Sequence, residues 1–258
     1  MAQLVRMWRN TRMVVLTAIC AALYAAILIP FKVVPIIPGV SEFRPANAVP
    51  IVCSFLFGPA AAWGAALGNL IAEFFGGLGP GDVFGSIANL CYGLLPYLVW
   101  DACTDASPVP RTAAGWAGLL TVILLASTLC ATIVGWGLNL LGLHPFTVSG
   151  TFVLVNNLVV AAVLGPLLLR VLHPRVAGAR LLYRDILGPA PRPSRPRALV
   201  AVALIAGGTL AAFAAGEAIS AGLWRPPWAP WRTPSGAREV GVGLLPLLAL
   251  VAAGFACL

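Results

Sequence analysis

Eight long apolar runs dominate this chain and restrict it to one class of fold. They fall at residues 13–30, 43–57, 59–76, 83–100, 114–141, 149–169, 198–221 and 241–257. A helix needs about 20 residues to cross a bilayer, and only helices and closed barrels satisfy their own backbone hydrogen bonds in lipid. Charged residues make up only 9% of the chain, too few to cover a soluble surface. We therefore predict an all-α fold, a polytopic bundle of membrane helices.

The second and third runs are short for membrane crossings. They contain about 15 and 18 residues, which at 1.5 Å per residue span roughly 22–27 Å. Residues 43–76 therefore form either two short helices or one long kinked helix. Because Gly58 and Pro59 separate the runs, and a Gly-Pro pair favours a turn, we predict two helices.

The basic residues indicate how the chain is oriented. If the N-terminus lies inside and every run crosses, eleven of the sixteen Lys and Arg residues fall inside and five fall outside. Cytoplasmic loops carry an excess of Lys and Arg. The count predicts that both termini are cytoplasmic, and the clustering of Arg at span ends accounts for the net charge of +8 without nucleic-acid binding.

A segment rich in Pro and Arg, residues 185–197, divides the chain. Its composition favours an extended, solvated backbone, which is typical of a linker. We predict that this cytoplasmic linker separates a six-span membrane core, residues 1–184, from a C-terminal transmembrane hairpin, residues 198–258.

Polar side chains recur near the outer ends of five core spans. Ionisable and amide groups are costly in lipid, so they tend to face a cavity, a partner or a ligand. Converging amides and carboxylates suit a small hydrogen-bonding molecule such as a heterocycle. The residues that we predict to bind it are Glu42, Arg44, Asn47, Glu73, Asp82, Asn89, Asn139, Asn156 and Asn157.

These residues also have structural interpretations. An Asn in a membrane helix often bonds to a neighbouring helix. Glu42 and Arg44 can pair with each other or with headgroups, and Asp82 can cap the helix that begins beside it. His144, close to these residues, is more typical of a loop than of a site. The binding hypothesis depends on the clustering rather than on any one residue.

The first span carries alanines four residues apart. Ala18, Ala22 and Ala26 form one register, and Ala21 and Ala25 form another. Such a flat stripe lets another helix approach closely. The spacing leaves open whether that helix belongs to this chain or to a second protein.

The motifs of several chemistries are absent from the sequence. There is no GxxxxGK[ST] phosphate loop, and Lys32 is the only lysine, so we predict no P-loop ATPase site in this chain. The sequence contains no HExxH motif, its six cysteines form no CxxC pair, and its two histidines accompany no clear serine nucleophile. We predict a protein without catalytic residues, a metal site or a cofactor of its own.

Three parts of the core carry a resemblance to a known family. They are Phe43-Arg44, the run GPAAAWGAALGNLIAEFFGGLG at 58–79, and DVFGS at 82–86 with Asn89. They resemble the substrate-binding (S) components of energy-coupling-factor (ECF) transporters, nearest to the queuosine-precursor transporter (QueT) family, over about residues 13–172. That family tends to have Arg followed by Ser-Glu, whereas here Ser41-Glu42 precedes Arg44.

The resemblance implies a membrane subunit that captures a small molecule from outside. Its substrate would be a vitamin- or nucleobase-like heterocycle, including a queuosine precursor, under a lid at residues 30–41. Ala18, Ala22 and Ala26, or the register through Ala21 and Ala25, would dock on an ECF transmembrane coupling protein. Two separate ATPase subunits would use the ATP, and the location would be the plasma membrane of a prokaryote.

Two other functions remain compatible with the residues. An ion-coupled secondary carrier or a channel would place a carboxylate near mid-membrane, where Glu73 and Glu217 are the candidates. A non-transporting membrane scaffold would use the alanine stripe and the C-terminal hairpin to hold a protein partner.

Overall fold

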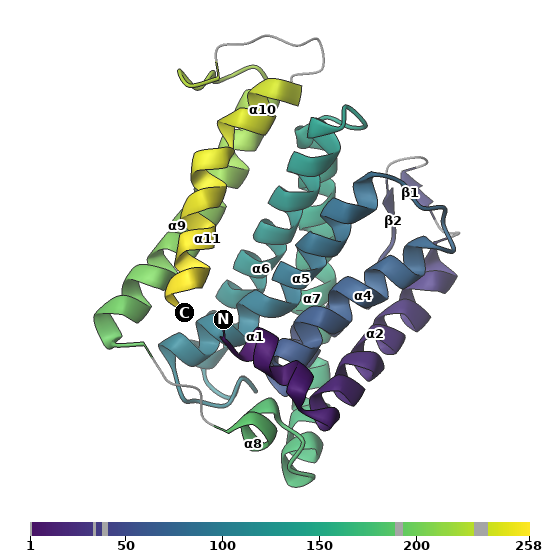
Figure 1. Ribbon diagram of the computed structural model, residues 1–258, viewed down its shortest axis with the longest axis vertical. Helices are drawn as coiled ribbons and strands as arrows, with labels where there is room; N and C mark the ends of the chain where they lie inside the picture. The colour runs from purple at the N-terminus through teal and green to yellow at the C-terminus, as the bar shows by residue number, and fades with distance from the viewer. Residues whose placement is uncertain (1, 33–34, 38–40, 189–192, 230–236) are drawn as a thin grey trace.

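The computed structural model describes residues 2–32, 35–37, 41–188, 193–229 and 237–258. It is an elongated helical bundle (Figure 1). The helices are α1 Ala2–Arg6, η1 Met7–Arg9, α2 Thr11–Phe31, η2 Pro45–Asn47, α3 Ala48–Phe57, α4 Pro59–Glu73, α5 Gly81–Cys103, α6 Ala113–Leu140, α7 Phe146–Gly178, α8 Tyr183–Leu187, α9 Arg195–Ser220, α10 Ala237–Gly243 and α11 Leu245–Cys257. Strands β1 Pro35–Ile37 and β2 Ser41–Glu42 form a small antiparallel pair. The predicted all-α membrane bundle is confirmed apart from this hairpin.

Within the described residues, six helical segments are long and apolar enough to cross a membrane. They are α2, α5, α6, α7 continued through α8, α9, and the last helix from Glu239 to Cys257. The protein is therefore a multi-pass membrane protein. Helices α3 and α4, with 10 and 15 residues, are too short for a full crossing each.

The predicted break between the second and third runs is also confirmed. Gly58 has φ of +52°, a conformation that favours glycine, and it turns the chain between α3 and α4. A Cβ at this position would lie 2.7 Å from the Tyr183 ring, so the turn has no room for a side chain. Tyr183 is held there by its hydroxyl, which lies 2.7 Å from both carboxylate oxygens of Asp101 on α5.

The short helices α3 and α4 run between the two ends of the bundle. We call the end with α1 and the last turn of α11 the terminal end, and the opposite end the loop end (Figure 1). Trp63, near the start of α4, donates its indole N–H to the Leu4 carbonyl at 3.0 Å, at the terminal end. Glu73, at the end of α4, forms an ion pair with Lys32 after α2, at the loop end. Helix α3 therefore runs toward the terminal end, and α4 returns to the loop end.

The tight packing of α2 on α4 separates the two alanine registers. Gly64 and Gly68 face α2, where added Cβ atoms would lie 2.4 Å from the Cys20 Cβ and 2.7 Å from the Ala21 carbonyl oxygen. Ala21 and Ala25 are buried in this contact. The other register, Ala18, Ala22 and Ala26, is exposed on the opposite side of α2. One register thus packs inside the chain, and the other is available to a partner or to lipid.

The observed helices narrow the predicted linker. Helix α8 covers residues 183–187, and α9 begins at Arg195 rather than at residue 198, so at most residues 188–194 lie between them, of which 189–192 are outside the described residues. The earlier start has a simple reason. Pro196 lies in the first turn of α9, where proline loses no helical hydrogen bond. The division into a core and a hairpin as separate units stays a prediction.

The C-terminal helices pack along α6 and α7. At the loop end, Trp136 of α6 donates to the Gly241 carbonyl at 3.0 Å, and Thr151 of α7 donates to Glu217 of α9 at 3.0 Å. Helices α9 and α11 lie side by side, with an added Cβ at Gly254 only 2.7 Å from Ile205 (Figure 1). The hairpin is therefore docked on the core by polar contacts at the loop end.

Candidate functional site

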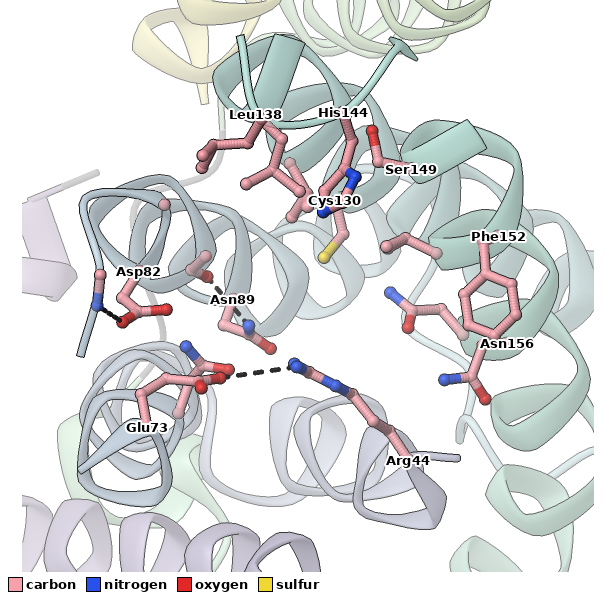
Figure 2. A pocket seen from close by; sticks show the side chains of 18 of the residues that line it. Arg44, Glu73, Asp82, Asn89, Cys130, Leu138, His144, Ser149, Phe152 and Asn156 are labelled. Carbon is pink, nitrogen blue, oxygen red and sulfur yellow. Dashed lines mark hydrogen bonds and ion pairs between the residues drawn. The ribbon is translucent and has the colours of Figure 1, made fainter. Parts of the chain in front are cut away.

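A polar cavity of about 540 Å³ opens among the helices at the loop end. Its walls come from α2, η2, α4, α5, α6 and α7. Seven of the nine predicted binding residues line it: Arg44, Asn47, Glu73, Asp82, Asn89, Asn156 and Asn157. The fold thus gathers polar groups that are up to 113 positions apart around one space, as Figure 2 shows for several of them.

A hydrogen-bond network joins four of the wall elements, α2, η2, α5 and α7. The Tyr24 hydroxyl lies 3.1 Å from Oδ1 of Asn47 and 3.2 Å from Oδ1 of Asn89, and its single proton goes to one of them at a time. Asn47 Nδ2 donates to Asn157 Oδ1 at 2.5 Å, and Asn89 Nδ2 donates to the Gly85 carbonyl at 2.9 Å. These three Asn side chains therefore bond to neighbouring groups of the protein, as the structural interpretation of an intramembrane Asn expects, while they also face the cavity.

An ion cluster closes one side of the cavity. Glu73 forms an ion pair with Lys32 through Oε2, and its Oε1 lies 3.5 Å from Arg44 Nη2 (Figure 2). The Lys32 and Glu73 side chains are only 7% and 10% exposed. Two cations thus neutralise Glu73, which makes it poorly suited to bind a further cation. Lys32 is not among the predicted site residues, although its being the only lysine in the sequence was a usable signal.

Asp82 differs from Glu73 in its surroundings. Its Oδ2 accepts the Gly79 N–H at 2.7 Å and so closes the turn before α5. Asp82 lies in the first turn of α5 and is not its N-cap residue, which is Pro80. Among the described residues, no cation lies within ion-pair distance of Asp82. Asp82 is therefore the cavity carboxylate best placed to receive a positive group of a ligand.

Asn69 is a cavity residue that the predicted site omitted. It lies one turn before Glu73 on α4, lines the cavity and is 1% exposed. Neither its Oδ1 nor its Nδ2 has a hydrogen-bond partner in the described part of the chain. A buried amide without partners is costly, about 1–3 kcal/mol. Its presence in a helix otherwise rich in Ala, Gly and Leu was the available sequence signal.

Helices α6 and α7 form the facing wall. Cys130, Val134 and Leu138 line the cavity at intervals of four residues along one face of α6. Asn139 is buried, but it is not among the lining residues, because consecutive residues on a helix point about 100° apart. The structure therefore does not bring Asn139 to the cavity with the other predicted residues.

His144, Ser149 and Phe152 complete this wall, opposite Arg44 and Glu73 (Figure 2). His144 follows α6 in the loop to α7, where a loop residue rather than a catalyst was expected. The loop position is correct, but the side chain also lines the cavity. Phe152 supplies an aromatic surface next to Asn156, which suits a flat ligand.

Two predictions fall partly outside the described residues. Glu42 belongs to strand β2, but its side chain is not described. The predicted lid at 30–41 includes residues 33–34 and 38–40, which are also outside the description. The β1–β2 pair that remains lies at the loop end (Figure 1).

A protein-family comparison covers the part of the chain that forms the cavity. The family model described as QueT transporter matches residues 14–174, more than half of the chain. The chain belongs to the QueT transporter family. The QueT match includes every described residue that lines the polar cavity, and it ends within α7, before the C-terminal hairpin. Comparisons with curated proteins and with solved structures give no match.

Proposed function

We propose that this QueT-family protein captures a queuosine precursor, or a closely similar heterocycle, in the polar cavity at the loop end. The observation that carries the proposal is the Asn69 amide, which lines the cavity with both polar atoms unpaired among the described residues. A flat heterocycle has donors and acceptors along one edge, which an amide can pair. Phe152 offers a stacking surface, and Asp82 offers a counter-charge for an amine.

The orientation of the cavity follows from the distribution of Arg. With both termini cytoplasmic, the loop end faces outward and receives substrate from outside, in the plasma membrane of a prokaryote. We propose the β1–β2 segment as part of a lid over this entrance. Mass spectrometry of small molecules released from the purified protein should identify the ligand. A heterocycle with an amine is expected, and a purely apolar molecule would contradict the proposal.

Replacing Asn69 with leucine separates binding from stability. The ligand is expected to lose two hydrogen bonds, so its affinity should fall about tenfold or more. The apparent melting temperature of the ligand-free protein should stay equal or rise, because a buried unpaired amide is removed. Binding is measured by titration of the purified protein with the identified ligand, and melting by thermal unfolding in detergent.

Asn139→Leu is the matched control for this test. Asn139 is another buried amide, whose oxygen has no hydrogen-bond partner in the described part of the protein, but it does not line the cavity. The control should bind ligand like the wild type. If the wild type and Asn69→Leu bind the ligand with equal affinity, Asn69 is not a ligand-binding residue.

The energy for uptake is proposed to come from partner subunits. The exposed register Ala18, Ala22 and Ala26 presents a flat strip on α2 that suits the ECF transmembrane coupling protein, which would in turn recruit two ATPases. An ion-coupled carrier would need a carboxylate free to exchange a cation. Glu73, one of the two carboxylates considered for that role, is paired with both Lys32 and Arg44 and is therefore poorly suited to it.

The Ala22→Leu variant tests the docking strip. The added side chain should hold a partner helix away and lower co-purification of the coupling protein at least about tenfold, while ligand binding by the isolated chain is kept. Ala211→Leu, at an exposed position of α9, is the control and should keep full assembly. Normal assembly of Ala22→Leu would assign the strip to lipid contact.

An uptake assay distinguishes the remaining functions. Cells that express this chain should import ligand only together with the coupling protein and the two ATPases. Uptake that survives ATP depletion but collapses with an uncoupler would instead establish an ion-coupled carrier. Absence of saturable binding, together with a constant protein partner, would establish a scaffold.

A further inference from the structure

A second cavity lies at the terminal end, far from the polar one along the bundle. It has a volume of about 730 Å³ and lies between the end of α5, the start of α6 and the first half of α9. Its walls are mainly apolar, with Trp100 and Val99 from α5, Val122 and Leu125 from α6, and Val202 from α9. The cavity therefore lies between the core helices α5 and α6 and the first half of α9.

The frame of this cavity is built by specific contacts. Trp100 donates its indole N–H to the Ala106 carbonyl at 2.8 Å, which holds the α5–α6 loop against the helix. Thr112 caps α6 by accepting the Gly115 N–H at 3.1 Å. Small residues on both sides, Gly118 on α6 and Ala206 on α9, keep the space open.

A cation lies at this apolar space. Arg111 lines the cavity at the start of α6, and it takes part in none of the ion pairs among the described residues. Arg195 lies two turns before Val202 on α9, on the same face of the helix by its spacing. Asp105, in the loop beside the cavity, already has an interaction partner. Arg111 thus places a positive charge in the wall of an otherwise mainly apolar chamber.

We propose that this cavity binds an anionic phospholipid, with one acyl chain between α6 and α9 and its phosphate at Arg111. Basic pockets between membrane helices recognise anionic headgroups through charge, and an apolar chamber of this size suits a hydrocarbon chain. A polar substrate would gain few hydrogen bonds there. The bound lipid would fill the space between core and hairpin at the terminal end, where the polar contacts of the loop end are missing from the described residues.

Photocrosslinking locates the lipid directly. The full-length protein is reconstituted in nanodiscs with phosphatidylglycerol that carries a diazirine near the end of one acyl chain, and crosslinked peptides are mapped by mass spectrometry. Crosslinks should concentrate on the cavity faces of α6 and α9, relative to the exposed positions Val159 and Val163 of α7, which serve as an internal standard. Phosphatidylcholine with the same diazirine should label the cavity less.

Two variants and one control decide the proposal. Arg111→Gln should lower phosphatidylglycerol labelling of the cavity about fivefold, the effect of one basic residue on an anionic lipid. Ala206→Phe should abolish cavity labelling by filling the space. Arg175→Gln, at an exposed position of α7 outside the cavity, should change nothing.

Three results would contradict lipid binding in this cavity. Cavity labelling no higher than labelling of α7, or labelling unchanged in Arg111→Gln, would overturn the proposal. So would a non-lipid molecule that co-purifies and is released from the cavity by Ala206→Phe. If Ala206→Phe aggregates, Arg111→Gln decides alone, because it changes an exposed side chain.

Discussion

Replacing Glu73 with alanine is expected to unfold the loop end of the protein rather than only to weaken ligand binding. The change leaves Lys32 and Arg44 as two positive charges around a buried position that is 7% exposed. Removing one partner of a buried ion pair typically costs about 3–5 kcal/mol. The measurement is the apparent melting temperature in detergent, together with the amount of monodisperse protein recovered from membranes.

A double variant separates charge imbalance from lost binding. Glu73→Ala combined with Lys32→Met should recover a large part of the lost stability, because the double variant also removes one of the two positive charges that face Glu73. Glu217→Ala is the control, since Glu217 is half-buried and has a hydrogen bond to Thr151, and it should cost about 1 kcal/mol. Wild-type stability in Glu73→Ala would show that the ion cluster does not hold α2, α4 and the segment of Arg44 together.

Replacing Gly68 with valine should break the contact between α2 and α4. An added Cβ would lie 2.7 Å from the Ala21 carbonyl oxygen and 3.0 Å from the Tyr24 Cβ, and the backbone atom cannot move aside as a flexible side chain would. Overpacking of this kind costs about 1–3 kcal/mol and occasionally more. Because Tyr24 also belongs to the cavity network, ligand affinity should fall with stability.

A graded series gives this test its control. Gly68→Ala should cost less than Gly68→Val. Gly207→Val, in a helix position where no atom lies within 4 Å of an added Cβ, should leave folding nearly unchanged. Thermal unfolding and ligand titration are measured on all three variants. Equal stability of Gly68→Val and Gly207→Val would mean that α2 and α4 are not closely packed in the membrane.

The sequence alone was sufficient to predict the class of fold and the positions of most helices. Hydropathy predicts them because lipid demands about 20 apolar residues for each crossing, a property of consecutive residues. The turn at Gly58 was predictable for a similar reason, since Gly-Pro acts on its own backbone. The resemblance to the QueT family was also detected in short continuous segments of the sequence, and the family comparison confirms it over residues 14–174.

Other parts of the site depended on contacts across the bundle. Hydropathy does not report how a helix is rotated, so it could not separate Ala22 from Ala21, or Leu138 from Asn139. A rotation of about 100° between neighbours decides which of them meets the cavity. Whether the Asn69 amide has a hydrogen-bond partner likewise depends on residues of other helices, so only the tertiary structure shows that it is unpaired among the described residues.

The sequence by itself determined that this protein is a membrane bundle of the QueT family with polar groups near one end. Only the tertiary structure decided which of those groups face a common cavity, and which are already paired. Lys32 and Glu73 are 41 positions apart, and Asn47 and Asn157 are 110 apart. Their partnerships depend on how whole helices pack, which no local pattern records. The same packing places Arg111 beside an apolar chamber at the opposite end.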